Sequence, residues 1–194
     1  MEKIKTEATI LIVPGLRDHV EEHWQTVLAA QLEKVRTVPP TEIDKLSCNN
    51  RVARIQAELD QIEGPVILVA HSAGVLMTIH WAALHSSENI KGALLVTPPD
   101  LNQSWPENYP SSTVLAQQGW SPLPTQKLPF PSIVIASDND HLASAASIEK
   151  MAQDWGSQCV NLGEVGHMNP ASGFGPWLEA QKFIRQLDQV LETV

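Results

Sequence analysis

Residues 66–74 read Val-Ile-Leu-Val-Ala-His-Ser-Ala-Gly, and they carry the strongest structural signal in the chain. The first five are apolar and do not alternate with polar residues, which is typical of a strand buried on both faces of a parallel sheet. A serine follows after one residue, with Ala70 and Gly74 two positions to either side of it, and the residues after it favour a helix. This strand–turn–helix order, with small-x-Ser-x-Gly at the turn, predicts that Ser72 stands at the carboxyl edge of the sheet.

The residues around Ser72 are of the types that a serine nucleophile needs. A serine hydroxyl is a weak nucleophile, so it must be exposed and hydrogen-bonded to a base. Small residues at Ala70 and Gly74 allow the strand and the helix to approach closely. The amide of Ala73, at the helix N-terminus, would face an oxyanion that develops there. The alternative interpretation is that Ser72 only caps the following helix.

Comparable apolar runs recur along the chain, and helical periodicity fills the intervals. Strands are predicted at 9–13, 66–70, 93–96, 133–136 and 159–162, with a weaker one near 35–38. The unbroken apolar character of these runs predicts burial on both faces. Helices are predicted at 22–34, 51–62, 73–84, 144–155 and 177–191. This alternation predicts a doubly wound α/β sheet with right-handed crossovers.

One segment, residues 98–131, departs from the alternation. It holds eight of the fourteen prolines, together with Trp105, Tyr109 and Trp120. A loop of this length in a compact domain is usually functional or disordered, and the aromatic residues argue against disorder. We expect a cap-like loop whose three aromatics contribute to a substrate pocket. The alternative is a surface excursion whose aromatics pack on the body of the domain.

Size and composition predict one globular domain over residues 1–194. Hydrophobic residues make up 43 % of the chain and charged residues 18 %, which suits a packed core. A net charge of −9 without a Lys/Arg cluster argues against a nucleic-acid partner. The apolar run Ala8–Val13 is too short for a signal peptide or a membrane span, so a cytoplasmic protein without a membrane partner is expected. Cys48 and Cys159 are expected to be free thiols.

The first predicted strand leads into Pro14-Gly15-Leu16. In folds of this kind a loop after an early strand supplies a second amide to the oxyanion hole, and Leu16 is the natural donor. An ordinary turn, which also favours Pro and Gly, is the alternative. Just beyond, His19 and His23 form an H-x-x-E-H pattern known from zinc peptidases. No third ligand is identifiable, so no metal and no cofactor are predicted.

An acid and a histidine follow Ser72 in the order Ser…Asp…His, which is the order in α/β-hydrolases. A predicted strand leads into Asp138 and Asp140, and both qualify as the acid by position. His167 lies on a Gly-flanked loop after the last predicted strand, where it can fold back toward Ser72. As the base it would take the hydroxyl proton, while the acid orients the imidazole. The rival base, His141, is adjacent to the acid and has little room beside Ser72.

These motifs together carry a family resemblance that covers nearly the whole chain. The matching residues are Val13-Pro14-Gly15 with His23-Trp24-Gln25, Ala70-His71-Ser72-Ala73-Gly74, Leu95-Val96 with Pro98, Ser137-Asp138-Asn139-Asp140, and Gly166-His167. The chain resembles the small serine hydrolases related to retinoblastoma-binding protein 9, including bacterial YdeN-like proteins. The resemblance implies an α/β-hydrolase fold, a three-layer sandwich with a mostly parallel sheet of about six strands and no large lid.

The resemblance also distinguishes the two acids. The family's acid usually stands immediately before Pro, and Asp140 holds that position with His141 in place of the Pro. Ser72 and His167 match the family's nucleophile and base. We therefore expect a Ser-His-Asp hydrolase that cleaves small esters, amides or thioesters through an acyl-enzyme, with carboxylesterase activity (EC 3.1) favoured. The alternative function is a catalytically weak module that binds a protein partner of unknown identity.

Overall fold

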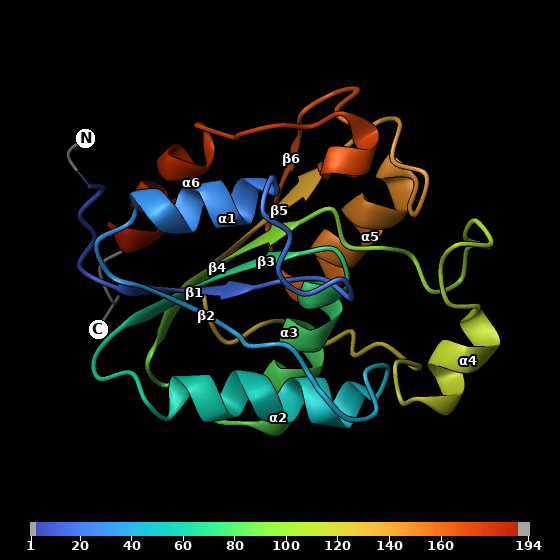
Figure 1. Cartoon of the computed structure of the whole chain (residues 1–194), viewed down its shortest axis with the longest axis horizontal. Helices are drawn as coiled ribbons and strands as arrows, with labels where there is room; N and C mark the ends of the chain where they lie inside the picture. The colour runs from blue at the N-terminus through green and yellow to red at the C-terminus, as the bar shows by residue number, and fades with distance from the viewer. Residues whose placement is uncertain (1–2, 190–194) are drawn as a thin grey trace.

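The computed structural model describes residues 3–189, which form a parallel sheet with helices on both faces (Figure 1). The six strands run in the order β2-β1-β3-β4-β5-β6, and every neighbouring pair is parallel. The predicted α/β sandwich is confirmed. The strands are β1 Thr9–Val13, β2 Val35–Thr37, β3 Val66–His71, β4 Ile90–Val96, β5 Ser132–Ala136 and β6 Gln158–Asn161.

The helices pack in two layers, one on each side of the sheet. Helices α1 and α6 cover one face, and α2, α3 and α5 cover the other (Figure 1). No helix within residues 3–189 is long and apolar enough to span a membrane. The helices are α1 Trp24–Gln31, α2 Cys48–Leu59, α3 Ala73–Leu84, α4 Ser112–Gln117, α5 Ala145–Trp155 and α6 Ala180–Asp188, with a short 3₁₀ helix, η1, at Pro170–Ser172.

Strand β3 runs through the centre of the core. Its residues Val66, Leu68 and Ala70 pack among the helices of one face, while Ile67 and Val69 pack among those of the other. All five are fully buried, which agrees with the apolar run in the sequence. Burial of a Val, Leu or Ile side chain contributes about 1.5–3 kcal/mol relative to exposure. The central strand is therefore a rigid support for the residue that follows it.

Strand β6, at one edge of the sheet, is more exposed than predicted. Strand β6 pairs only with β5 and forms an edge, and most of its residues are exposed. The prediction that this run is buried on both faces is wrong, because an apolar run does not reveal whether its strand lies at the edge. Cys159 on this strand is an exposed free thiol, whereas Cys48 is a buried one.

Two short elements were not predicted, and the helices predicted at 22–34 and 177–191 are shorter than expected, the first extending only over Trp24–Gln31. Helix α4 has six residues, begins after the N-cap Ser111, and lies within the segment 98–131. Its length is below that at which a helical period is recognisable. Helix α6 begins at Ala180 rather than near Trp177, and residues 190–191 of the predicted helix lie outside the described residues.

The turn between β3 and α3 requires glycine at position 74. A Cβ built on Gly74 would overlap the carbonyl oxygen of Val13 and would lie 2.7 Å from that of Pro14. Both oxygens belong to backbone, so neither can move aside without shifting β1 or the loop after it. The small residue inferred from the sequence is therefore a packing requirement.

We predict that Gly74→Ala lowers the free energy of unfolding by about 1–3 kcal/mol, because overpacking against fixed backbone forces the helix away from the strand. Urea denaturation of the two proteins measures this difference. Gly175→Ala is the matched control, since a Cβ at Gly175 would meet no atom within 4 Å. Equal losses of stability in the two variants would contradict the packing explanation.

Candidate active site

Ser72 lies at the turn between the central strand β3 and helix α3. Its backbone has φ 57° and ψ −128°, a region that L residues rarely adopt. Such a conformation costs on the order of 1–3 kcal/mol and persists only where the surroundings enforce it. Here the amide of Ser72 donates to the carbonyl of Val96 on β4 at 2.9 Å, which ties the turn to the sheet.

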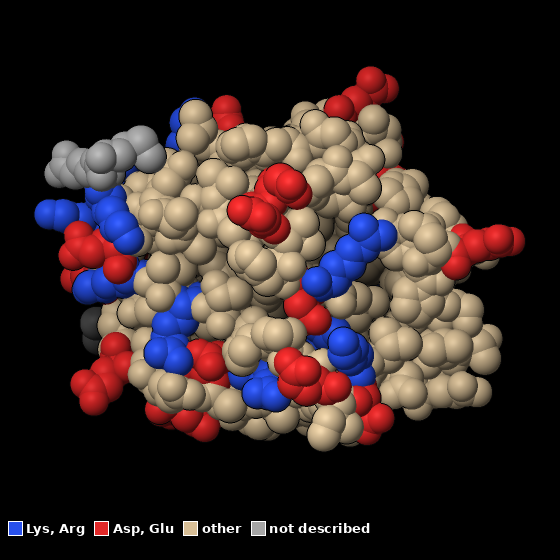
Figure 2. Space-filling view, viewed as in Figure 1, with Lys and Arg blue, Asp and Glu red and all other residues tan. Residues whose placement is uncertain are grey.

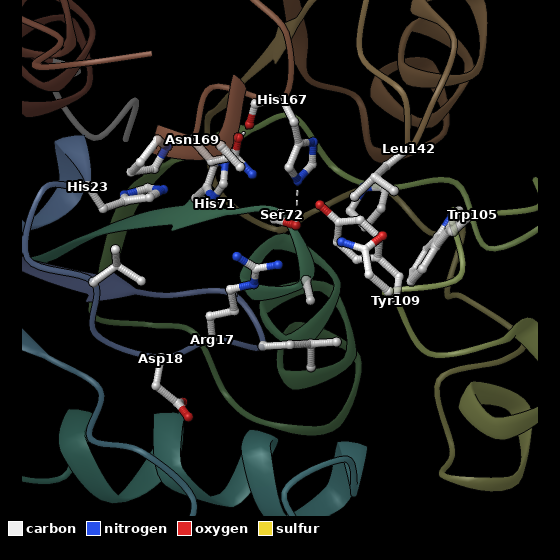
Figure 3. Close-up of a pocket in the computed structure, with 18 of the residues that line it drawn as sticks. Arg17, Asp18, His23, His71, Ser72, Trp105, Tyr109, Leu142, His167 and Asn169 are labelled. Atoms are coloured by element: carbon white, nitrogen blue, oxygen red, sulfur yellow. Dashed lines mark hydrogen bonds between the residues drawn. The ribbon is translucent and has the colours of Figure 1, made fainter. Parts of the chain in front are cut away.

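Ser72, His167 and Asp140 form one hydrogen-bonded chain, of which the bond between Ser72 and His167 is drawn in Figure 3. The Oγ of Ser72 lies 2.7 Å from Nε2 of His167, and Nδ1 of His167 lies 2.9 Å from both carboxylate oxygens of Asp140. An ionised carboxylate only accepts hydrogen bonds, so Nδ1 carries the proton and Nε2 is left to accept from the serine hydroxyl. The side chains of His167 and Asp140 are 2 % and 0 % exposed, which shields the hydrogen bonds between them from water.

The two alternative residues near this chain do not take part in it. Asp138 is exposed and accepts a hydrogen bond from Asn161 Nδ2 at 2.7 Å. The Nε2 of His141 shares a hydrogen bond of 3.2 Å with the hydroxyl of Tyr109. The tertiary structure therefore separates Asp140 from Asp138, which their positions in the sequence alone did not.

The loop that carries His167 is held from two sides. The amide of Gly166 donates to Asn139 Oδ1 at 2.6 Å, and the amide of His167 donates to Ser172 Oγ at 3.1 Å. Gly166 has φ 61°, and a Cβ there would lie 2.7 Å from Cβ of Ser172. Asn139 and Ser172 were not identified as functional from the sequence, because their roles depend on contacts between separate loops.

A further residue, His71, supports His167 from beneath. Its Nε2 donates to the carbonyl of His167 at 2.8 Å, and the hydroxyl of Thr97 donates to the same oxygen at 3.3 Å. His71 thus points away from the hydroxyl of Ser72. Burial, reinforced by the neighbouring imidazoles, holds the pKa of His71 well below its ordinary value of 6.5.

His23 completes this buried group of imidazoles. Its ring centroid lies 4.6 Å from that of His71, and its Nδ1 accepts from the amide of Gln25 as the N-cap of α1. Burial, together with the charge that His167 can carry, lowers the pKa of His23 from 6.5 to about 4. Since α1 begins at Trp24, His19 and His23 do not share a helix. Residues 3–189 contain no cluster of three or more metal-ligating side chains.

Ser72 opens into a cavity of about 210 Å³ that is also lined by Leu16 and Ala73. A Cβ on Gly15 would lie 3.4 Å from Cβ of Ser72, so the loop after β1 runs directly beside the serine. Among the described residues, the amides of Leu16 and Ala73 have no hydrogen-bond acceptor. Both amides are therefore available to a ligand at Ser72.

The aromatic residues of the segment 98–131 divide between two places. Trp105 and Tyr109 line the cavity, as predicted, and Leu142 lies near them (Figure 3). Trp120 does not line it, and this part of the prediction is wrong. Its ring is 1 % exposed, and its Nε1 donates to the carbonyl of Leu46 at 2.7 Å, so it anchors the segment to the core.

Charged side chains are mixed on the surface of the molecule. On the face shown in Figure 2, Lys and Arg lie among Asp and Glu, and the part over α4 carries few charges. This face has no broad basic patch of the kind that follows a phosphate backbone.

Comparison with solved structures identifies the class of protein. A YdeN-like hydrolase of Pectobacterium atrosepticum is similar, with 30 % identity, a TM-score of 0.80, and coverage of 94 % of this chain and 91 % of that one. The ydeN gene product of B. subtilis has 17 % identity, a TM-score of 0.70 and coverage of 93 % and 98 %. Est1E from Butyrivibrio proteoclasticus has 12 % identity, a TM-score of 0.67 and coverage of 97 % and 87 %. The fold is that of the α/β-hydrolases.

A family model matches most of the chain. The family model named Serine hydrolase matches residues 10–186, so the chain belongs to the serine hydrolases, and within them it is YdeN-like. No curated protein matches the chain. The resemblance inferred from the motifs is confirmed.

The low pKa values of His23 and His71 predict how stability depends on pH. The unfolded chain takes up protons near pH 6.5, whereas the folded chain resists them, so lowering the pH below about 6.5 favours unfolding. We expect the free energy of unfolding to fall more steeply between pH 7 and pH 5 in the natural protein than in His23→Asn. Asn retains an N-cap acceptor for α1 but does not titrate. Parallel slopes in urea denaturation across this range would rule out the contribution of His23.

Proposed function

We propose that the chain hydrolyses small carboxylic esters through a covalent acyl-enzyme, with Ser72 as nucleophile, His167 as general base and Asp140 as the acid that orients it. The hydrogen-bonded chain from Ser72 through His167 to Asp140, at the wall of a cavity, is the observation that carries this proposal. Its geometry supports the required tautomer, in which Nε2 of His167 accepts the hydroxyl proton.

The proposed reaction has two halves. Ser72 Oγ attacks the ester carbonyl while its proton passes to Nε2 of His167, and the resulting oxyanion accepts hydrogen bonds from the amides of Leu16 and Ala73. Collapse of this intermediate expels the alcohol, which takes the proton from His167. Water then gives a proton to His167 and attacks the acyl carbonyl, after which the acid leaves and Ser72 recovers its proton.

The size of the cavity and the chemistry of the leaving group indicate the substrate. About 210 Å³ is below the usual range for drug-sized ligands, which favours small acyl and alcohol groups. An ester is cleaved more readily than an amide, because an alkoxide is a better leaving group than an amide anion. Structural neighbours include a thermophilic esterase from Thermogutta terrifontis and a thioesterase domain from the curacin pathway, each under 25 % identical. They show that the fold accommodates ester and thioester chemistry.

The segment 98–131 supplies the apolar wall in this proposal. Trp105 and Tyr109 pack edge to face with ring centroids 6.3 Å apart, and Nε1 of Trp105 donates to the carbonyl of Asp100 at 2.8 Å. These contacts give the two rings fixed positions in the cavity. The segment therefore serves as a small cap that presents apolar surface to the substrate.

Replacement of the nucleophile tests the proposal directly. We predict that Ser72→Ala abolishes both turnover of 4-nitrophenyl acetate and labelling by a fluorophosphonate probe, because among the described residues no other hydroxyl is bonded to the imidazole of His167. His167→Ala should lower kcat by about 10³–10⁶-fold. Ser86→Ala, at an exposed serine beyond α3, is the control and should react normally. Labelling that persists in Ser72→Ala would overturn the assignment.

The two aspartates provide a second test. We predict that Asp140→Asn lowers kcat/KM by about 10³–10⁴-fold, because an amide leaves His167 in the wrong tautomer. Asp138→Asn should change kcat/KM by less than about tenfold, since Asp138 is exposed and bonded to Asn161. Steady-state kinetics on 4-nitrophenyl acetate distinguishes the two. The reverse ranking would assign the acid to Asp138.

A further inference from the structure

The cavity around Ser72 has two chemically different sides (Figure 3). Trp105, Tyr109 and Leu142 lie on one side of the serine and offer apolar surface. The opposite side includes three residues that carry hydrogen-bond donors: Arg17, His23 and Asn169. We call these three residues the donor side. A substrate that fills both sides is therefore apolar at one end and rich in hydrogen-bond acceptors at the other.

Arg17 supplies the charge of the donor side. It is the only Lys or Arg among the residues that line the cavity, and its guanidinium extends toward Ser72 (Figure 3). The neighbouring Asp18 does not neutralise it, because Asp18 pairs with Nη1 of Arg51 at 2.7 Å. The Arg51 side chain is 4 % exposed, so this pair is fixed in the structure. Within residues 3–189, Arg17 has no hydrogen-bond or ionic partner.

The other two donors have their orientation set by the protein. Nδ1 of His23 accepts from the amide of Gln25 at 3.2 Å, so its proton lies on Nε2. His23 is 8 % exposed, and Nε2 has no acceptor among the described residues. Oδ1 of Asn169 accepts from the amide of Ser172 at 2.9 Å, which leaves its NH₂ group as a donor. Two neutral donors thus accompany one permanent cation.

We propose that the substrates of this site are esters that carry a carboxylate, which the donor side binds while the apolar side holds the remainder. This inference rests on the proposed esterase function and specifies its substrate class. A carboxylate has two oxygens with about four acceptor sites, which match the guanidinium fork and two further donors. The net charge of −9 does not prevent this, because remote charges are screened beyond about 8 Å at physiological salt.

Two pairs of matched esters test the proposal and locate the carboxylate. The first pair, the 4-nitrophenyl monoester of adipic acid and 4-nitrophenyl hexanoate, differs in charge on the acyl side. The second, 4-acetoxybenzoate and 4-acetoxybenzamide, differs in charge on the alcohol side. For each pair, the kcat/KM of the charged ester is divided by that of the neutral ester, and the same ratio is taken for the rate constants of uncatalysed hydrolysis. We expect the enzymatic ratio to exceed the uncatalysed ratio by about tenfold in at least one pair, which is the size of effect that a charge-assisted hydrogen bond gives.

Variants of Arg17 test whether this residue produces the preference for the charged ester of each pair. Arg17→Gln should abolish the preference, and Arg17→Lys should retain most of it. His23→Asn, which keeps the helix cap but lacks the Nε2 donor, should reduce it. Arg185→Gln is the matched control, because it removes an equal charge from the exposed end of α6 and should leave the ratio unchanged. An equal loss in Arg185→Gln would attribute the preference to net charge instead.

The outcomes distinguish this inference from the proposed function. If the natural protein hydrolyses neutral and charged esters alike, and Arg17→Gln does not alter the ratio, the carboxylate preference is refuted while the esterase function stands. If the natural protein hydrolyses none of the four esters, the esterase function fails. Calorimetric titration of Ser72→Ala with 4-acetamidobenzoate and 4-acetamidobenzamide then tests whether the donor side binds a carboxylate. Tighter binding of the benzoate, lost on adding Arg17→Gln, supports the carboxylate site; equal binding overturns it.

Discussion

At Ser72 the chain turns from the central strand into α3 with φ 57° and ψ −128°, and the rest of the site is arranged around that turn. The conformation is enforced from both ends. The amide of Ser72 bonds to Val96, its carbonyl accepts from the amide of Val75, and Gly74 lies against the backbone of the first strand. Burial of β3 on both faces supplies the free energy that holds such a turn. The serine is thereby fixed before any substrate binds.

A group of neutral imidazoles lies beside the hydrogen-bonded pair of His167 and Asp140. The ring of His71 has its centroid 5.1 Å from that of His167 and donates to its backbone. A positive charge at that distance would oppose an imidazolium at His167 by about 3 kcal/mol at an effective dielectric constant of about 20. Burial keeps the pKa of His71 low and so removes that opposition. The same burial that positions His167 also protects its ability to take a proton.

The walls of the cavity come from different parts of the chain. The loop after β1 provides Leu16 and Arg17, so the proposed oxyanion donor and a cation without a partner among residues 3–189 are adjacent in sequence. The apolar wall comes from the segment 98–131, which the buried ring of Trp120 anchors to the core. Because the two walls are built on separate loops, either can change its chemistry without disturbing the turn at Ser72.

The sequence by itself determined the parallel sheet, because unbroken apolar runs such as Val66–Ala70 leave no residue suited to a solvated face. It also determined the bounds of α3 and the order of Ser72, Asp140 and His167 along loops after strands. Only the tertiary structure decided that β6 is an edge and that Trp120 supports rather than lines the cavity. It also places Asp140, which the family resemblance favoured over Asp138, against His167. The physical reason is that periodicity reports local geometry, whereas a contact such as that between Ser72 and His167, which are 95 positions apart, depends on strand order and loop path.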